Sequence, residues 1–203
     1  FGGKQMDAVT MEKGGNSEDA MTIQYNPLPD ISKGEELAVN VGSNCCFISS
    51  LSNLTWLPDQ AYQPGAWGYV GGKSKSTTSE IMNTVDGPVY QTWREGDLEY
   101  KIDAPKGEYE VELLLADVTK PSDQLPNLLA RSSSEASSKD VKFDVIINGD
   151  RKEAGFTPTD GRHYRTAFKR RYLIHNNGTS IDVLLKSQQG KAFLNGIKVR
   201  KMD

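Results

Sequence analysis

The chain has 203 residues, of which 36% are hydrophobic and 25% charged, and its formal net charge is −3. This composition is typical of a soluble globular protein, with room for one domain plus appendages or for two small domains. The negative charge argues against a nucleic-acid partner, because phosphate binding needs many clustered cations. No apolar run reaches the roughly 18 residues of a membrane-spanning helix, so we expect no membrane insertion.

The first part of the chain differs in composition from the rest. Residues 1–34 are rich in Gly, Asp, Asn and Pro, and two prolines interrupt the segment 26–30. We interpret 1–34 as a linker or as the tail of a preceding domain, and 35–203 as one β-sandwich domain. Because the chain opens with Phe1 and lacks an initiator Met, we expect it to be a fragment of a larger protein.

Beyond residue 36, short alternating apolar segments are separated by turn residues. In chain order, the expected strands are 37–41, 89–94, 98–102, 109–115, 141–147, 181–185 and 192–199. Asn148-Gly149, directly after one of them, is the strongest short-range hairpin signal. No segment has a convincing 3.6-residue apolar period. The pattern predicts an all-β fold, either a sandwich or a jelly roll.

Two segments interrupt this pattern. Residues 51–79 contain two tryptophans and two tyrosines among many Gly, Pro and Ser, and we expect a long ordered loop because aromatic residues argue against disorder. Residues 119–140 contain two prolines and a run rich in serine, which predicts a mobile surface loop.

The cysteines and the basic residues have simple interpretations. Cys45 and Cys46 are adjacent, so they cannot both reach distant segments, and a strained vicinal disulfide is the alternative to free thiols. We expect two free thiols, one in the core and one at the surface or against a loop. The basic cluster 169–171 precedes an apolar run and is expected at a solvated strand edge or turn.

The motifs of catalysis are missing from the sequence. There is no nucleophile elbow, no phosphate-binding loop and no paired-histidine metal motif. His163 and His175 lie in polar turn regions, where ordinary surface histidines are expected, and they show no zinc-ligand spacing with the cysteines. We therefore expect this chain not to be an enzyme by itself.

An aromatic-rich segment is the main candidate for ligand binding. Sugars present flat C–H patches that fit aromatic faces, and hydroxyl edges that fit planar polar groups. The candidate sugar-binding residues are Trp56, Tyr62, Trp67, Tyr69, Tyr90 and Arg94. The alternative is that these aromatic residues cover the core of a small sandwich.

The expected strand 89–94 divides its side chains between two faces. Tyr90 and Arg94 would share one face, and Trp93 would lie on the other. We expect Tyr90 and Arg94 to be exposed toward a ligand, and Trp93 to be buried.

Six segments, in this order, resemble malectin and malectin-like domains over residues 37–200. They are 38–42, 67–72, 89–94, 107–111, 143–149 and 193–199. The stretch Leu57-Pro58-Asp59-Gln60-Ala61-Tyr62 before Trp67 is similar to malectin-like domains at the C-terminus of bacterial glycoside hydrolase family 2 enzymes. Those enzymes are typically β-galactosidases of gut Bacteroides-type bacteria.

The resemblance implies a galactose-binding-like jelly-roll sandwich that binds carbohydrate. It also implies export to the periplasm or cell surface of a bacterium. The implied partners are an oligosaccharide or polysaccharide and the catalytic domains of the parent chain. Folds of this kind often carry a structural calcium, but no acidic loop here identifies one, so we expect no cofactor.

About half of the sugar-binding residues of animal malectin have a counterpart in this sequence. Its loop tyrosine falls on or near Trp67, and the tyrosine of its Tyr-Gln-Thr motif falls on Tyr90. Its second aromatic pair would follow residue 118, where Thr119-Lys120-Pro121 stands, and its Asp would lie near 188–190, where none occurs.

Two functions follow from this comparison. The first is a non-catalytic carbohydrate-binding module of a larger secreted glycoside hydrolase, which binds oligosaccharide through loop aromatics. The second is a structural, interdomain or dimerisation module of that enzyme with no sugar binding of its own.

Overall fold

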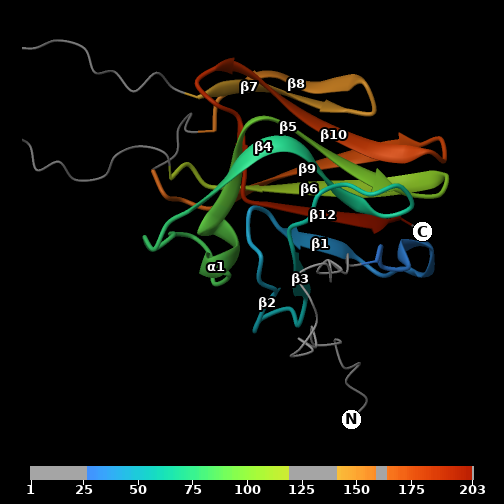
Figure 1. Ribbon diagram of the computed structural model, residues 1–203, viewed down its shortest axis with the longest axis horizontal. Helices are drawn as coiled ribbons and strands as arrows, with labels where there is room; N and C mark the ends of the chain where they lie inside the picture. The colour runs from blue at the N-terminus through green and yellow to red at the C-terminus, as the bar shows by residue number, and fades with distance from the viewer. Residues whose placement is uncertain (1–26, 119–140, 159–163, 203) are drawn as a thin grey trace, which may run out of the picture.

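A computed structural model describes residues 27–118, 141–158 and 164–202. Two sheets pack face to face as a β-sandwich (Figure 1), which confirms the predicted all-β, jelly-roll-like fold. Within the described ranges, no helix has the length and apolar character needed to cross a membrane.

The first sheet runs in the order β2-β3-β1-β12-β6-β9. Its strands are antiparallel except for the β1–β3 pair, which is parallel. The bounds are β1 (Leu37–Asn40), β2 (Phe47–Ile48), β3 (Thr55–Pro58), β6 (Gly107–Leu115), β9 (Phe168–Asn176) and β12 (Gly196–Lys201).

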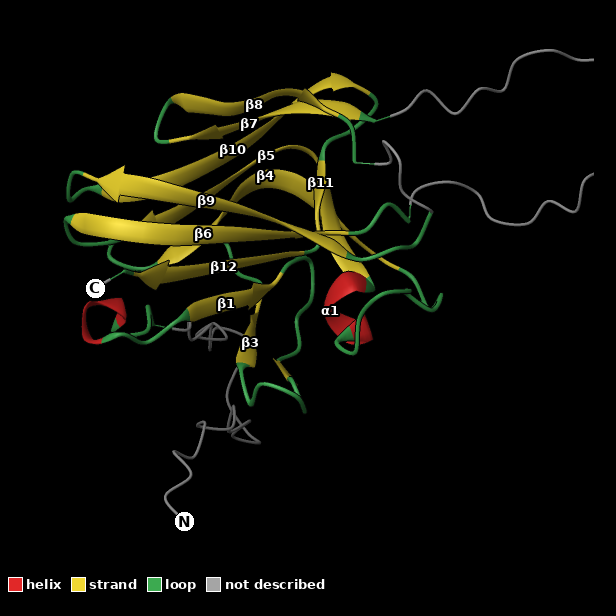
Figure 2. Cartoon of the chain, turned by 180° about the vertical axis from the view of Figure 1, so that it is seen from behind, coloured by secondary structure: helices red, strands yellow, loops and turns green. Residues whose placement is uncertain are grey.

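The second sheet runs in the order β11-β5-β10-β7-β8, and β4 also pairs with β5. The bounds are β4 (Trp67–Ser76), β5 (Thr92–Asp103), β7 (Lys142–Ile147), β8 (Asp150–Phe156), β10 (Ser180–Gln189) and β11 (Phe193–Leu194). The helical elements of the described chain are the 3-10 turn η1 (Ile31–Lys33) and α1 (Gly87–Tyr90). Helix α1 lies at the end of the sandwich opposite to the C-terminus (Figure 2).

The inward faces of both sheets form one main core. Val111 and Ile197 of the first sheet and Val145 and Val183 of the second are fully buried members of it. Each such side chain stabilises the fold by about 1.5–3 kcal/mol relative to an exposed position. Ile31 is also buried in this core, so residues 27–34 lie against the sandwich. The linker interpretation of residues 1–26 falls outside the described residues.

The structure corrects the expected strand at 89–94. Residues 87–90 form α1, and β5 begins only at Thr92. Pro88 stands in the first turn of α1, where its fixed φ favours a helix and its missing N–H is not needed.

The structure also corrects the expected loop at 51–79, which contains β3 and the ten-residue β4. The outer half of β4 is polar and exposed, and a bulge between Gly71 and Lys73 breaks its register with β5. Because of these two features, the sequence of β4 does not show the apolar alternation from which a strand is predicted.

The hairpin at Asn148-Gly149 is confirmed, because both residues have positive φ between β7 and β8. The expected loop at 119–140 lies outside the described residues.

The cysteine interpretation was wrong in one respect. Both thiols are free in the described structure, but both are exposed, because Cys45 and Cys46 lie in the bend before β2 and not in a strand. The basic cluster 169–171 lies on β9, the last strand of its sheet, so the expected strand edge is confirmed.

Asn195 is a fully buried polar residue where several chain segments meet. Its Nδ2 donates to the carbonyl oxygens of Tyr90 (2.8 Å) and Thr92 (3.1 Å), and its Oδ1 accepts from the N–H of Ala116 (2.9 Å). One side chain therefore fixes the junction between α1 and β5 relative to the end of β6.

The carboxylate of Glu112 forms the second polar anchor of this region. It is almost fully buried on β6, and it is bound by Lys169 Nζ (3.0 Å) and Arg171 Nε (2.5 Å) from the neighbouring strand β9. Burial raises the pKa of the Glu112 carboxyl, but the hydrogen bonds from Lys169 and Arg171 outweigh burial, so the pKa lies below its usual value of 4.5.

Asn195→Ala is expected to lower the free energy of unfolding by about 3 kcal/mol, because three buried backbone groups lose their partner. Urea denaturation measures this change. Asn177→Ala, at an exposed position, is the matched control and should change stability by less than about 0.5 kcal/mol. A loss below about 1 kcal/mol for Asn195→Ala would contradict the role of this amide.

Glu112→Gln is expected to destabilise the domain in a pH-dependent way. A carboxyl whose pKa is lowered by folding adds stability above pH 4.5, and this stability is lost as the pH falls through the lowered pKa. The loss should be about 1 kcal/mol at pH 7, because both cations are largely solvated, and it should shrink as the pH falls below 4.5. Urea midpoints of the wild type and variant at pH 7 and over a series of acidic pH values test this expectation. A pH-independent difference would contradict it.

Candidate functional site

The six candidate residues do not converge on one open surface. Trp56, Trp67, Tyr90 and Arg94 are buried, whereas Tyr62 and Tyr69 are half-buried. The side chains occupy the main core, a second core cluster, an interior ion-pair network and the far end of β5. Each group has a separate physical explanation.

Trp67 is a core residue. It is fully buried in the main cluster, and its Nε1 donates to the carbonyl oxygen of Pro27 at 3.4 Å. Trp56 is buried in a second, smaller cluster that also contains Tyr90 and Leu114. The alternative reading of the aromatic residues, that they cover the core, therefore describes both tryptophans.

The expected exposure of Arg94 was wrong, because only 8% of the residue is accessible. Its Nε binds Asp59 Oδ2 at 2.6 Å, and its guanidinium lies 3.1 Å from the centre of the Tyr69 ring. Tyr100 donates to the other oxygen of Asp59 at 2.8 Å. Burial raises the pKa of the Asp59 carboxyl in spite of these partners. The predicted burial of Trp93 is confirmed.

Tyr62 lies at the opposite end of the sandwich from α1. Its hydroxyl donates to the Asp103 carboxylate, with distances of 3.0 and 3.1 Å to the two oxygens. Asp103 ends β5 and Thr92 begins it, so roughly 35 Å of extended strand separates them. Tyr62 and Tyr90 cannot bind the same small sugar.

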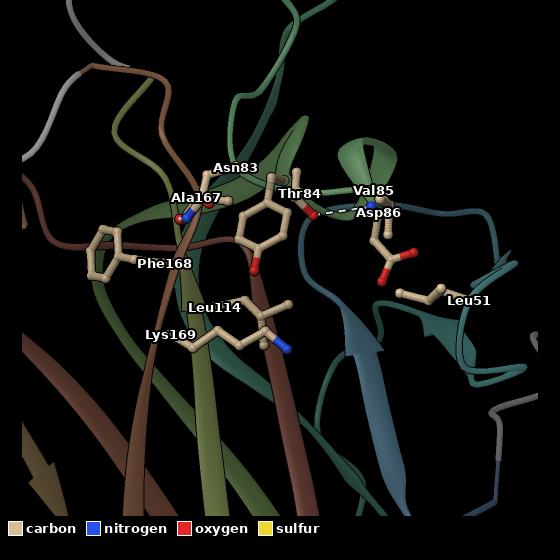
Figure 3. A pocket seen from close by; sticks show the side chains of 10 residues that line it. Leu51, Asn83, Thr84, Val85, Asp86, Leu114, Ala167, Phe168 and Lys169 are labelled. Carbon is tan, nitrogen blue, oxygen red and sulfur yellow. Dashed lines mark hydrogen bonds between the residues drawn. The ribbon is translucent and has the colours of Figure 1, made fainter.

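A pocket with a volume of about 870 Å³ lies beside α1. Figure 3 shows its lining, which comes from four parts of the chain. The lining residues are Leu51, Asn83, Thr84, Val85, Asp86, Tyr90, Leu114, Ala167, Phe168 and Lys169. Tyr90 is the one candidate from the sequence that lines this pocket, although it was expected on an exposed strand and is only 2% accessible.

Backbone contacts hold the two main walls of the pocket together. Met82 N–H donates to the Arg165 carbonyl (2.8 Å), and Ala167 N–H donates to the Met82 carbonyl (2.9 Å). Asn83 Nδ2 donates to the Ala167 carbonyl (3.0 Å), so the fold uses one of its two amide N–H donors. Thr84 Oγ1 accepts from Asp86 N–H at 3.0 Å, which fixes the turn before α1 (Figure 3).

The two residues after Tyr90 anchor the same corner. Gln91 Nε2 donates to the Ser79 carbonyl at 3.1 Å, and Thr92 Oγ1 donates to Asn40 Oδ1 at 3.0 Å. The Tyr-Gln-Thr motif therefore combines one pocket residue with two structural anchors.

Two polar groups in the pocket are not used by the protein. Among the described residues, neither the Tyr90 hydroxyl nor Asp86 Oδ1 has a hydrogen-bond partner. Burial raises the pKa of the Tyr90 phenol above its ordinary value, and the charges of Glu112 and Asp86 raise it further. The phenol therefore stays protonated and can donate a hydrogen bond.

Part of the pocket rim is apolar. Leu51 is 79% accessible and Val85 is 67% accessible, and both line the pocket from different segments. Exposed side chains of this size provide a surface for a flat apolar face. The pocket thus combines apolar contact with two free polar groups.

Sequence reasoning missed much of this site. Leu51, Val85 and Lys169 carried no aromatic or catalytic signal, and they meet Tyr90 and Asp86 only through the fold. The described chain contains no cluster of three or more His, Cys, Asp or Glu side chains that could hold a metal ion. The absence of a cofactor stays a prediction.

Solved structures resemble the chain over most of its length. A crystal structure of Bacteroides uniformis β-glucuronidase has a TM-score of 0.73 and 40% identity, and the match covers 86% of this chain and 19% of that chain. A structure of Bacteroides uniformis β-glucuronidase 2 has a TM-score of 0.72 and 42% identity over 84% of this chain and 18% of that chain. This chain therefore spans about a fifth of the length of either relative.

A more distant likeness concerns the fold alone. The plant receptor-like kinase FER has a TM-score of 0.61 and 17% identity, over 82% of this chain and 49% of that chain.

No curated protein sequence matches the chain. The family described as the malectin domain matches residues 36–197. With the sandwich and the β-glucuronidase likeness, this match shows that the chain belongs to the malectin domain family.

Proposed function

We propose that this domain is a non-catalytic carbohydrate-binding module of a larger glycoside hydrolase, and that it binds oligosaccharide in the pocket beside α1. The observation that carries the proposal is the pair of unused polar groups, the Tyr90 hydroxyl and the Asp86 carboxylate, in a pocket with a partly apolar rim. Of the six sequence candidates, the proposal keeps Tyr90 as the residue in contact with sugar.

The chemistry of the pocket suits a sugar. A volume of about 870 Å³ is within the usual range of small-ligand sites. Leu51 and Val85 offer apolar surface for the C–H face of a ring, and Tyr90 and Asp86 offer a donor and an acceptor for its hydroxyls. Phe168 and Leu114 complete the apolar lining. The hydrogen bonds of Gln91 and Thr92 hold the chain beside Tyr90 in a fixed position. A binding site that is already ordered pays less conformational entropy when the ligand binds.

The parent enzyme is the second part of the proposal. The two bacterial relatives of 40% and 42% identity are β-glucuronidases, so we propose a glycoside hydrolase of that general kind for the parent chain. The β-galactosidase activity implied by the sequence resemblance stays a prediction. We also propose export to the bacterial periplasm or cell surface, where polysaccharides are met. The bacterial source of both relatives supports the bacterial part of this proposal.

A structural or dimerisation role is the second candidate. The exposed Leu51 and Val85 favour it, because apolar side chains beside a pocket also suit contact with another domain or another copy. Burial of Trp56, Trp67 and Arg94 favours it as well, because it removes three of the expected sugar contacts. Sugar titration separates the two candidates.

Tyr90→Phe is expected to weaken oligosaccharide binding at least fivefold, because it removes the free hydroxyl and keeps the buried ring. Calorimetric or NMR titration with neutral gluco- and galacto-oligosaccharides measures the affinity. Thermal unfolding of Tyr90→Phe should stay close to that of the wild type, because the described protein gives this hydroxyl no partner.

Tyr62→Phe is the matched control for this experiment. It makes the same chemical change at the other end of β5, where the hydroxyl is bound to Asp103. It should leave sugar affinity unchanged. If the wild type binds none of the oligosaccharides at millimolar concentration, the structural role replaces the binding role. If Tyr62→Phe weakens binding as much as Tyr90→Phe, the binding site lies elsewhere.

A further inference from the structure

We infer that the pocket beside α1 selects a neutral sugar unit and discriminates against the matching uronate, in which a carboxylate replaces the C6 hydroxymethyl group. This inference rests on the proposed function, because it names the class of sugar that the same pocket takes. It follows from which charged groups of the pocket are free and which are already bound within the protein.

The negative charge of Asp86 is not compensated by the protein. Asp86 precedes α1, and its Oδ1 is buried without a hydrogen-bond partner among the described residues. Figure 3 shows its carboxylate directed toward the space beside Leu51. A sugar hydroxyl can donate to this carboxylate, whereas a uronate carboxylate is only an acceptor and would add a like charge.

The positive charge of Lys169 is partly offset within the protein. Its Nζ lies 3.0 Å from Oε1 of Glu112, and only 1% of the Glu112 side chain is accessible. This contact engages one of the three N–H donors of the ammonium group. Because the Glu112 carboxylate offsets much of its charge, Lys169 attracts a second carboxylate less strongly than an unpaired lysine would.

The remaining polar groups do not favour an anion. The Asn83 amide uses one of its two N–H donors for the Ala167 carbonyl. The Tyr90 hydroxyl can donate a single hydrogen bond, and the nearby negative charge of Asp86 would also repel a bound carboxylate. A neutral sugar satisfies both free groups, because each of its hydroxyls both donates and accepts.

Matched glycosides test this inference directly. The methyl β-glycosides of glucose, galactose and mannose are titrated into the chain at fixed ionic strength and neutral pH, each against its own uronate. NMR chemical shifts detect weak binding. We expect at least one neutral glycoside to bind at least tenfold tighter than its uronate. Equal affinity, or tighter uronate binding, overturns the inference and leaves the proposed function standing.

Asp86→Asn tests the assigned cause. The substitution keeps the size of the side chain, removes its charge and adds a donor, so the preference should fall to threefold or less. Asp150→Asn is the matched control, because it removes the same charge from an exposed position on β8 and should leave the preference unchanged. A preference unchanged in a folded Asp86→Asn protein overturns the assignment to Asp86.

The failure of the proposed function gives a different result. In that case no glycoside in either charge form shifts the resonances of pocket residues, and Tyr90→Phe changes no affinity for the oligosaccharides. Such a result overturns the proposed function, and the selectivity inference with it. Binding of both forms with a Tyr90-dependent affinity but no preference overturns selectivity alone.

Discussion

The buried amide of Asn195 is the interaction on which the candidate site depends. A side-chain amide without access to water is tolerated only when its polar atoms are paired. Here the amide pairs with backbone groups at both ends of the α1–β5 junction and at the end of β6. Because these partners are fixed backbone atoms, the corner has one geometry, and the position of Tyr90 is set by the fold and not by a mobile loop.

The same corner explains the distribution of charge in the pocket. Tyr90 is held against β6, the strand that carries Glu112, and β9 supplies Lys169 and Arg171 to that carboxylate. Lys169 and Arg171 thus stabilise a buried acid. Among the described residues, Asp86 Oδ1 has no hydrogen-bond partner, and this unpaired acceptor gives the pocket its preference for a partner that donates hydrogen bonds.

The six aromatic and basic candidates show why composition cannot identify a binding site. A large ring with a polar edge suits a sugar surface, and it suits a core equally well. Trp67 satisfies its indole N–H within the protein, and Arg94 finds Asp59 some 35 positions away in the chain. Nothing local to either residue predicts those partners. Tyr90 lines the candidate pocket, but its expected secondary structure and exposure were wrong.

The sequence by itself determined the all-β sandwich, the malectin resemblance, most of the central strands and the hairpin at Asn148-Gly149. These features depend on apolar alternation and on turn chemistry, which act between residues close in the chain. Only the tertiary structure decided which aromatic side chains are core. It also decided the pocket, because its lining joins Leu51, the 83–90 segment, Leu114 and residues 167–169. Contacts between such distant segments depend on strand order and packing, which local sequence patterns do not specify.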